Sequence, residues 1–302
     1  MTGSLARPTF ARPATLFLAS SPEPPPRFGA ALFGAPLDLT ESFRPGTRAG
    51  PTAVRQVSDS LEAYSPTLDR DLVDTPLSDL GDLALDGMAM AEALDRIAAA
   101  MAYAVNQSRL AVMIGGEHTA SLGGFRGARR VRPDAVLVQV DAHLDMRAHY
   151  QGELFSHATW LHRVGEEFGF DVIHQVGLRS GERQEWQFAR QHTAWSSTGL
   201  IVPRDVRERV GERPVYVSID IDVLDPAHAP GTGCPEPGGV TFRELAAFLY
   251  DLGDLNVVAV DVMEVSPLFD PANITAAAAA KLIREAVLLF AARDQPARAS
   301  PP

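Results

Sequence analysis

The sequence predicts a single α/β domain in which helices cover both faces of a mostly parallel sheet. Apolar runs of strand length alternate with helical stretches, such as the Ala- and Met-rich segment 87–107, and this alternation is typical of buried parallel sheets. The 302 residues suffice for one large domain or two small ones. Because no shift in composition divides the chain, we predict one catalytic domain over residues 29–302, preceded by a Pro-rich N-terminal arm over residues 1–28.

Local signals mark the ends of several predicted helices. Thr241 and Glu244 form a capping-box pattern ahead of the apolar run 245–249, and Pro51 favours a helix start. The Ala-rich run 275–292 is apolar nearly all round, which indicates a buried closing helix rather than a membrane span. We interpret these residues as structural.

Three predicted strands end in residues that can bind a metal ion. The strands occupy residues 110–114, 135–140 and 214–218. The residues that follow them are His118, Asp141, His143, Asp145, Asp220 and Asp222. Residues i and i+2 of a strand lie on one face, so Asp220 and Asp222 are expected to point the same way. Two such carboxylates repel each other unless a cation neutralises them, so the pair indicates a bound cation.

The chemistry of this set indicates two ions. It joins carboxylates and imidazoles without a thiolate, a combination that suits manganese better than structural zinc. Six ligands exceed the needs of one ion, so the economical interpretation is two ions roughly 3.5–4 Å apart. Each motif alone is weakly informative, because a histidine or an Asp-x-His-x-Asp run often serves a turn or the core. Their combination at three strand ends predicts a binuclear centre with two Mn²⁺ per chain.

These motifs resemble the metal-binding signatures of the ureohydrolases, the arginase and agmatinase family. They read GGEHT at 115–119, DAHLD at 141–145 and SIDIDVLDPAHAPGTGCPEPGG at 218–239. Further similarity runs in order from residue 34 to residue 267 and favours agmatinases over arginases. The resemblance implies the arginase-like fold, three α/β/α layers around a sheet of about eight strands.

The resemblance also distributes the ligands between the two ions. One ion would be held by His118, Asp141, Asp145 and Asp220. The other would be held by Asp141, His143, Asp220 and Asp222. Asp141 and Asp220 would therefore bridge the pair.

Three residues carry the reaction that the resemblance implies. Glu264 follows the apolar run 257–260 and would bind the substrate guanidinium, for which a fixed carboxylate is a natural partner. His157 would lie over the substrate and exchange protons with solvent, and Asp145 would pass a proton from the attacking oxygen to the leaving amine. The expected reaction is attack of a metal-bridging hydroxide on the guanidinium carbon of agmatine, which yields urea and putrescine.

Two residues depart from the family pattern, and a third bears on the substrate. Ala158 stands where the family has glycine, so a backbone needing positive φ would be strained there. Cys234 replaces a hydroxyl residue, and we interpret it as a small buried side chain rather than a metal ligand or an oxidation-sensitive site. Arg147 would suit a carboxylate-tailed substrate, unless it is exposed or paired with Glu153.

Two alternatives to an agmatinase stay open. The segment 146–155 lacks the polar residues that receive the amino-acid head group in arginases, so the nearest alternative substrate is guanidinobutyrate or another guanidino acid, with arginine disfavoured. A catalytically silent, metal-dependent binding protein is the alternative from another class, and the presence of every ligand and of Glu264 disfavours it.

Composition restricts compartment and partners. The net charge of −11 disfavours nucleic acid, and no apolar stretch reaches membrane length, so we expect a small guanidino substrate as the partner and no membrane. The N-terminal apolar run is too short for a secretory signal, and a single cysteine agrees with a reducing cytoplasm. The resemblance implies a homo-oligomer, either a trimer or a hexamer. The sequence leaves open whether the arm is disordered or lies across a neighbouring subunit.

Overall fold

The central sheet has eight strands, and every neighbouring pair is parallel, as predicted. The computed structural model describes residues 5–24 and 27–292. The strand order is β4-β1-β5-β10-β9-β6-β7-β8. The strands are β1 (Ala30–Ala35), β4 (Leu77–Asp82), β5 (Leu110–Gly115), β6 (Val136–Val140), β7 (Ile173–Val176), β8 (Trp195–Ser196), β9 (Pro214–Asp220) and β10 (Asn256–Met263). A separate antiparallel ribbon joins β2 (Tyr64–Ser65) and β3 (Arg70–Asp71).

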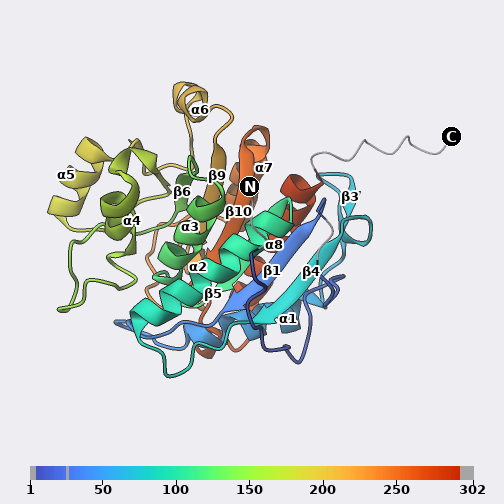
Figure 1. The fold of residues 1–302 in the computed structure, drawn as a ribbon. Helices are drawn as coiled ribbons and strands as arrows, with labels where there is room; N and C mark the ends of the chain where they lie inside the picture. Colours follow the sequence, from blue (N-terminus) through green and yellow to red (C-terminus); the bar gives the residue numbers. More distant parts are fainter. Residues whose placement is uncertain (1–4, 25–26, 293–302) are drawn as a thin grey trace.

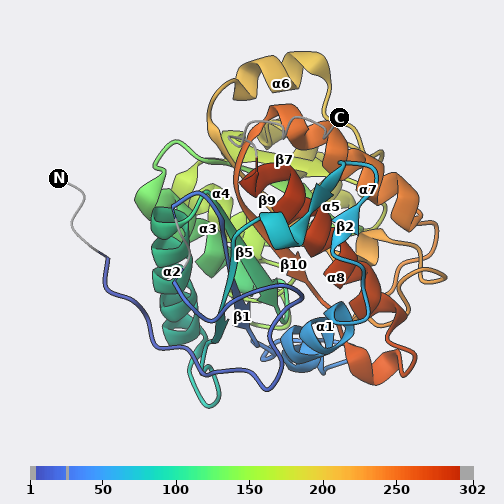
Figure 2. The same cartoon turned by 90° about the vertical axis from the view of Figure 1, so that its right-hand side faces the viewer.

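Helices cover both faces of this sheet, which gives the predicted three layers (Figures 1 and 2). One face carries α2 (Met90–Gln107), α3 (Ala120–Val131) and α4 (Trp160–Phe168). The other carries α1 (Gly50–Ser58), α7 (Phe242–Asp251) and α8 (Ile274–Ala286). The remaining helices are α5 (Arg183–His192) and α6 (Arg204–Val210). Within the described ranges, no helix combines the length and the apolar character that a membrane span requires.

The predicted helix signals are confirmed. Thr241 caps α7 reciprocally with Glu244, and Pro51 lies in the first turn of α1. The Ala-rich run forms α8, which continues into a π-helical turn (Val287–Ala291), and most of its residues are buried.

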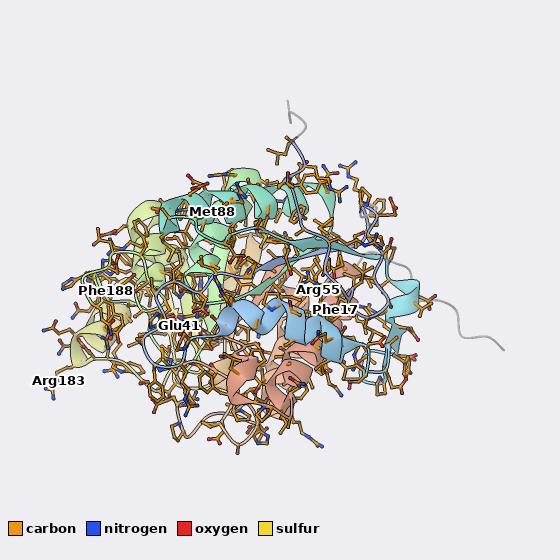
Figure 3. The ribbon with its side chains drawn as sticks, turned by 90° about the horizontal axis from the view of Figure 1, so that it is seen from below. Phe17, Glu41, Arg55, Met88, Arg183 and Phe188 are labelled. Carbon is orange, nitrogen blue, oxygen red and sulfur yellow. The ribbon has the colours of Figure 1, made fainter. Side chains whose placement is uncertain are left out.

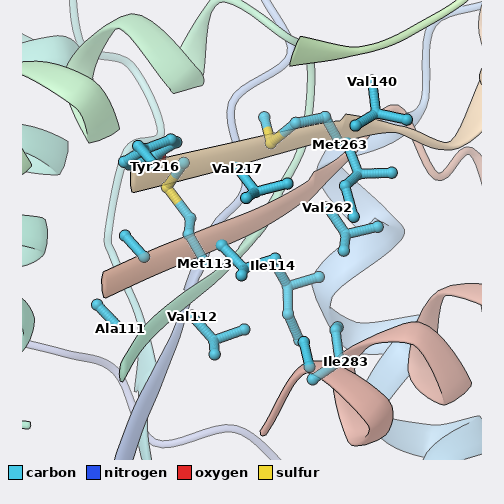
Figure 4. Packing of buried hydrophobic residues seen from close by; sticks show 14 of the residues in the cluster. Ala111, Val112, Met113, Ile114, Val140, Tyr216, Val217, Val262, Met263 and Ile283 are labelled. Carbon is cyan, nitrogen blue, oxygen red and sulfur yellow. The ribbon is translucent and has the colours of Figure 1, made fainter. Parts of the chain in front are cut away.

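The core lies between the central strands and the two helical layers. Figure 4 shows Val112, Val217 and Val262 from three adjacent strands together with Ile283 of α8. All four side chains are fully buried. Because β5, β9 and β10 are covered on both faces, their sequences read as continuous apolar runs rather than alternating ones.

The N-terminal segment, as far as it is described, packs against the edge strand β4. Ala11 and Ser21 form isolated bridges with Asp82 and Ser78 of β4, and Phe17 is 1% exposed. The backbone amide of Phe17 donates to Asp79. This part of the arm therefore shares the core of the domain that follows it.

A buried ion cluster lies beneath the same segment. Arg55 of α1 donates to both carboxylate oxygens of Asp79, at 2.7 and 2.9 Å, and to Asp82 at 2.5 Å. Figure 3 shows Arg55 beside Phe17. Both the guanidinium and Asp79 are fully buried, so each is neutralised within the fold.

Candidate active site

The predicted metal ligands all lie at the carboxyl ends of neighbouring strands. Because the order runs β5-β10-β9-β6, the residues after β5, β9 and β6 meet at one edge of the sheet. Within the described residues, the potential ligand atoms fall into two groups, each with atoms within 4.8 Å of one another. The first group is His118, Asp141 and Asp145, and the second is Asp141, His143 and Asp222.

Asp141 belongs to both groups, as its predicted bridging position requires. Asp220 lies beside the first group, with Oδ2 at 3.1 Å from Nδ1 of His118, and its Oδ1 accepts from the backbone amide of Asp222 in the second group. In the second group, Nδ1 of His143 lies 2.9 Å from Oδ2 of Asp222. The structure thus brings all six predicted ligands together.

One local expectation was wrong. Asp220 and Asp222 do not share a strand face, because β9 ends at Asp220 and a 3-10 turn (Ile221–Val223) follows. The carboxylate of Asp220 caps that turn by accepting from the backbone amide of Asp222 at 2.8 Å. The turn, rather than the pleat of a strand, aims Asp222 at His143.

His118 carries the clearest indication of a cation-binding site. Its Nδ1 is buried and makes no hydrogen bond of normal geometry, although carboxylate oxygens of Asp141, Asp145 and Asp220 lie 3.1–3.3 Å away. Burial alone would lower the pKa of His118, but the three carboxylates raise it well above 6.5. Burial, together with neighbouring carboxylates, raises the pKa of Asp141 to about 7. A divalent cation satisfies both the orphaned nitrogen and the crowded carboxylates.

Contacts around the ligands fix their orientation. Gln139 donates to Oδ2 of Asp141 at 2.7 Å, and the indole of Trp160 donates to Oδ2 of Asp145 at 2.8 Å. The outer nitrogen of His118, Nε2, lies 2.9 Å from the hydroxyl of Ser218. That hydroxyl donates to the buried carboxylate of Asp261, which also accepts from Tyr216 and Ser121. Such partners hold metal-binding side chains in one geometry. These outer residues were not predicted, because nothing in their own motifs distinguishes them from core polar residues.

Glu264 lies at the end of β10 beside the metal ligands. Its Oε1 accepts from the backbone amide of His118 at 2.6 Å. Burial, followed by the charges of Glu41 and Asp220, raises the pKa of Glu264 well above its ordinary value. Its φ is 66°, and that of Asp145 is 52°. Left-handed backbone at residues with a Cβ costs roughly 1–3 kcal/mol and is common at functional sites.

A loop after β1 forms a wall of the site beside Glu264, and sequence reasoning did not include it in the site. The buried carboxylate of Glu117 accepts from the backbone amides of Leu39 and Thr40 and from the hydroxyl of Thr40, and so holds this loop in place. Glu41 follows directly, in the segment before α1 (Figure 3). The loop could not be assigned to the site from its own sequence, since only the adjacency of β1 and β5 brings it there.

His157 lies against the same loop. Its Nδ1 is 3.5 Å from the hydroxyl of Thr40, and its Nε2 is 3.3 Å from the hydroxyl of Ser42. The imidazole ring packs edge-on against the ring of Tyr150, with 5.6 Å between the ring centroids. Ala158 has no positive φ, so the anticipated backbone strain is absent there.

The rim of the cleft contains a partly exposed ion cluster around Arg147. Its Nε lies 3.2 Å from Glu185 and its Nη2 lies 3.4 Å from Glu182, while the guanidinium covers the ring of Tyr150. Of the alternatives left open by the sequence, the pairing of Arg147 with Glu153 is therefore replaced by pairing with Glu182 and Glu185. Helix α5 begins at this point, and its first turn supplies Glu185.

These residues line one cavity of about 380 Å³. Metal ligands and Glu264 form its floor, the loop with Glu41 and Ser42 forms one wall, and Arg147 stands at the rim. Cys234 also lines it, half-buried, and belongs to neither ligand group within the described residues. Burial raises the pKa of its thiol to about 12, which makes it a poor thiolate ligand.

Fold and site together define an α/β protein with a candidate metal centre at the carboxyl ends of parallel strands. A family model described as "Arginase family" matches residues 28–289. The chain belongs to the arginase family, which confirms the resemblance drawn from its motifs, and it is a ureohydrolase by that membership.

Individual relatives agree over nearly the whole chain. Agmatinase of Bacillus subtilis is 39% identical over 279 residues, covering 91% of this chain and 96% of that protein. Guanidinobutyrase of Pseudomonas aeruginosa is 33% identical over 269 residues, covering 85% and 84%. The structure of proclavaminate amidino hydrolase from Streptomyces clavuligerus has a TM-score of 0.83 at 33% identity, covering 97% of this chain and 100% of that one.

Proposed function

We propose that the protein hydrolyses the guanidino group of agmatine to urea and putrescine at a binuclear manganese centre. The observation that carries the proposal is the convergence of the metal ligands and Glu264 at one cleft, which five of the ligands line while Asp141 is fully buried. The agmatinase relative in Bacillus subtilis supports agmatine as the substrate.

Two ions would share the ligands. One would be held by His118, Asp141, Asp145 and Asp220, and the other by Asp141, His143, Asp220 and Asp222. When bound, a pair of divalent ions supplies a nucleophile by lowering the pKa of water. The oxygen-rich donor set with two imidazoles suits manganese.

The chain's own residues bind the substrate and move protons. Glu264 accepts hydrogen bonds from N–H groups of the guanidinium and so fixes the plane of that group. Oδ2 of Asp145 accepts from the indole of Trp160 and lies near Nδ1 of His118. Oδ1 is therefore the atom that takes the proton from the attacking oxygen and passes it to the leaving amine. His157, held by Thr40 and Ser42 at the cleft wall, exchanges protons with solvent. The products are urea and an amine.

The rim favours an ammonium tail over a carboxylate. Arg147 is engaged by Glu182 and Glu185, so one positive charge faces two negative ones. A terminal ammonium therefore meets net negative charge. Guanidinobutyrate remains the second candidate, because Arg147 itself lines the cleft.

The test is urea release by the manganese-loaded protein from agmatine, guanidinobutyrate, guanidinopropionate and arginine, compared through kcat/KM. Preference for agmatine supports the proposal, and preference for an acid-tailed substrate replaces agmatine with a guanidino acid. No urea from any of the four, with two ions verified per chain, favours a silent metal-dependent binding protein.

Glu264→Gln separates substrate binding from metal binding. We expect kcat/KM to fall about 100-fold or more, since a buried charge-assisted bond is lost, while metal analysis still finds two ions per chain. Loss of metal from this variant would contradict the assigned role of Glu264.

Three broader assignments are also proposals. The arginase-family match begins at residue 28, which supports an arm over residues 1–28 and a catalytic domain over residues 29–302. Exposed Phe43 and Leu268, 65% and 71% exposed, support assembly into a trimer or hexamer, which light scattering would measure. We also propose a cytoplasmic location, supported by the single cysteine.

A further inference from the structure

We propose that Glu41 binds the guanidinium group together with Glu264, so that two carboxylates rather than one form the cation-binding end of the cleft. The inference rests on the proposed hydrolysis of a guanidino substrate. It adds a binding residue from a part of the chain that none of the metal motifs includes.

The geometry brings the two carboxyl groups to the same place. Both line the cleft beside His118 and Cys234. Gly233 lies between them, because a Cβ added to it would be 2.8 Å from Oε2 of Glu41 and 3.3 Å from Oε2 of Glu264. The two oxygens therefore border one small space that the absence of a side chain at residue 233 leaves open.

The carboxylate of Glu41 is incompletely satisfied by the protein. Oε1 accepts from the hydroxyl of Thr47 at 3.2 Å, whereas Oε2 is buried and accepts from no N–H or hydroxyl group of the protein. The carboxyl of Glu264 is its polar neighbour, so the two acids face each other without a cation between them. A buried acceptor without a partner costs roughly 1–3 kcal/mol, more when it is charged. Such an atom in a substrate cleft indicates a partner that arrives with the ligand.

No cation of the fold neutralises this pair. Within residues 5–24 and 27–292, neither carboxyl forms an ion pair with a lysine or arginine. The charged groups around Glu41 are His157, Glu117, Asp38 and Glu264, of which only His157 can be positive. Burial is the largest influence on the pKa of Glu41 and raises it, while the hydrogen bond with Glu264 acts in the opposite direction.

A guanidinium is the cation whose shape matches two carboxylates. It is planar, permanently charged and presents N–H groups along several edges. Glu264 can accept from one edge while Glu41 accepts from another, which fixes the plane of the group beside the metal ligands. An ammonium of similar charge lacks these separated edges, so the pair selects the guanidino end of agmatine and leaves the ammonium for the rim.

The experiment measures binding of methylguanidinium to the manganese-loaded protein by calorimetry, alongside KM and kcat for agmatine. For Glu41→Gln we expect the dissociation constant to rise about 10- to 100-fold, the range of one charge-assisted hydrogen bond. KM should rise more than kcat falls, and two ions per chain should remain. Glu153→Gln, which removes the same charge from an exposed loop residue, should leave the dissociation constant unchanged.

A second variant approaches the pair from the other side. Gly233→Ala keeps both charges but places a methyl group in the space between them, and it should also weaken methylguanidinium binding. Unchanged or tighter binding in Glu41→Gln overturns the inference, as does loss of metal with normal affinity in the loaded fraction. If the wild type binds methylguanidinium through Glu41 yet releases no urea, the proposed function fails while this inference stands.

Discussion

Two buried clusters of charged residues in this molecule differ in whether the protein itself supplies a cation for the carboxylates. Arg55 and Asp79 neutralise each other in the core, and Arg55 also donates to the partly exposed Asp82. The six metal ligands place four carboxylates around two imidazoles, and Nδ1 of His118 is left without a normal hydrogen bond. The first cluster stabilises the fold, whereas the second requires a cation from outside. A group of buried carboxylates without a counterion from the protein therefore identifies the functional site more directly than burial or polarity does.

The largest expected effect comes from replacing the ligand that both groups of metal ligands share. Asp141 belongs to both ligand groups, so Asp141→Asn should release both ions and lower kcat about a thousandfold or more. Metal analysis and urea release measure the two effects. Asp134→Asn, at an exposed position two residues before β6, serves as the control, and two ions retained in Asp141→Asn would contradict the assignment.

A change in the Arg55 cluster should affect the stability of the protein rather than its activity. Arg55→Met leaves Asp79 buried without its cation, which we expect to cost about 3–5 kcal/mol in the free energy of unfolding. Denaturant unfolding measures that loss, while KM for agmatine stays near the wild-type value. Arg48→Met removes an exposed pair with Asp86 and should cost less than about 1 kcal/mol. Equal losses in the two variants would remove the distinction between the clusters.

Metal removal should make stability depend on pH in a particular direction. Asp141 has a pKa of about 7 in the folded, metal-free chain and 3.8 as its ordinary value. The folded chain therefore holds a proton that the unfolded chain releases, and stability falls as pH rises between these values. Because ions replace that proton, the difference in Tm between loaded and metal-free protein should widen by several degrees from about pH 5 to pH 7. A constant difference would contradict a protonated Asp141 in the metal-free fold.

The smallest effect is expected at the rim, where the charges are exposed and partly paired. Glu182 is 63% exposed and pairs with Arg147, so its contribution is limited to about 1 kcal/mol. Glu182→Gln should reduce the preference for agmatine over guanidinobutyrate by about two- to fivefold in kcat/KM. Glu153→Gln is the matched control, and an equal change in both variants would reflect net charge alone.

The clustering of the proposed ligands could be predicted from the sequence because the ends of the strands can be recognised in it. Apolar runs followed by acidic residues and histidines indicate the carboxyl edge of a parallel sheet, and the structure brings His118, Asp141 and Asp220 together there. The local conformation was harder to predict from the sequence, since the 3-10 turn at Asp222 depends on a side-chain cap. The partners of Arg147 depend on where α5 begins, which its own loop does not reveal.

Glu41 shows a different limit of sequence reasoning. It lies far from Glu264 in the chain, and only the order β1-β5-β10 brings the loop after β1 to the end of β10. Periodicity indicates that strands exist but not which strands are neighbours. A residue whose role depends on a distant strand therefore becomes visible only in the folded chain.

The packing of the N-terminal segment on β4 has a consequence for solubility. An uncovered edge strand offers free amides and carbonyls to other chains and invites aggregation. Here the two edges are protected differently: β8 has only two residues, whereas the longer β4 is bridged by Ala11 and Ser21. Shortening the chain at its N-terminus would expose a template for intermolecular β-pairing while leaving every metal ligand in place.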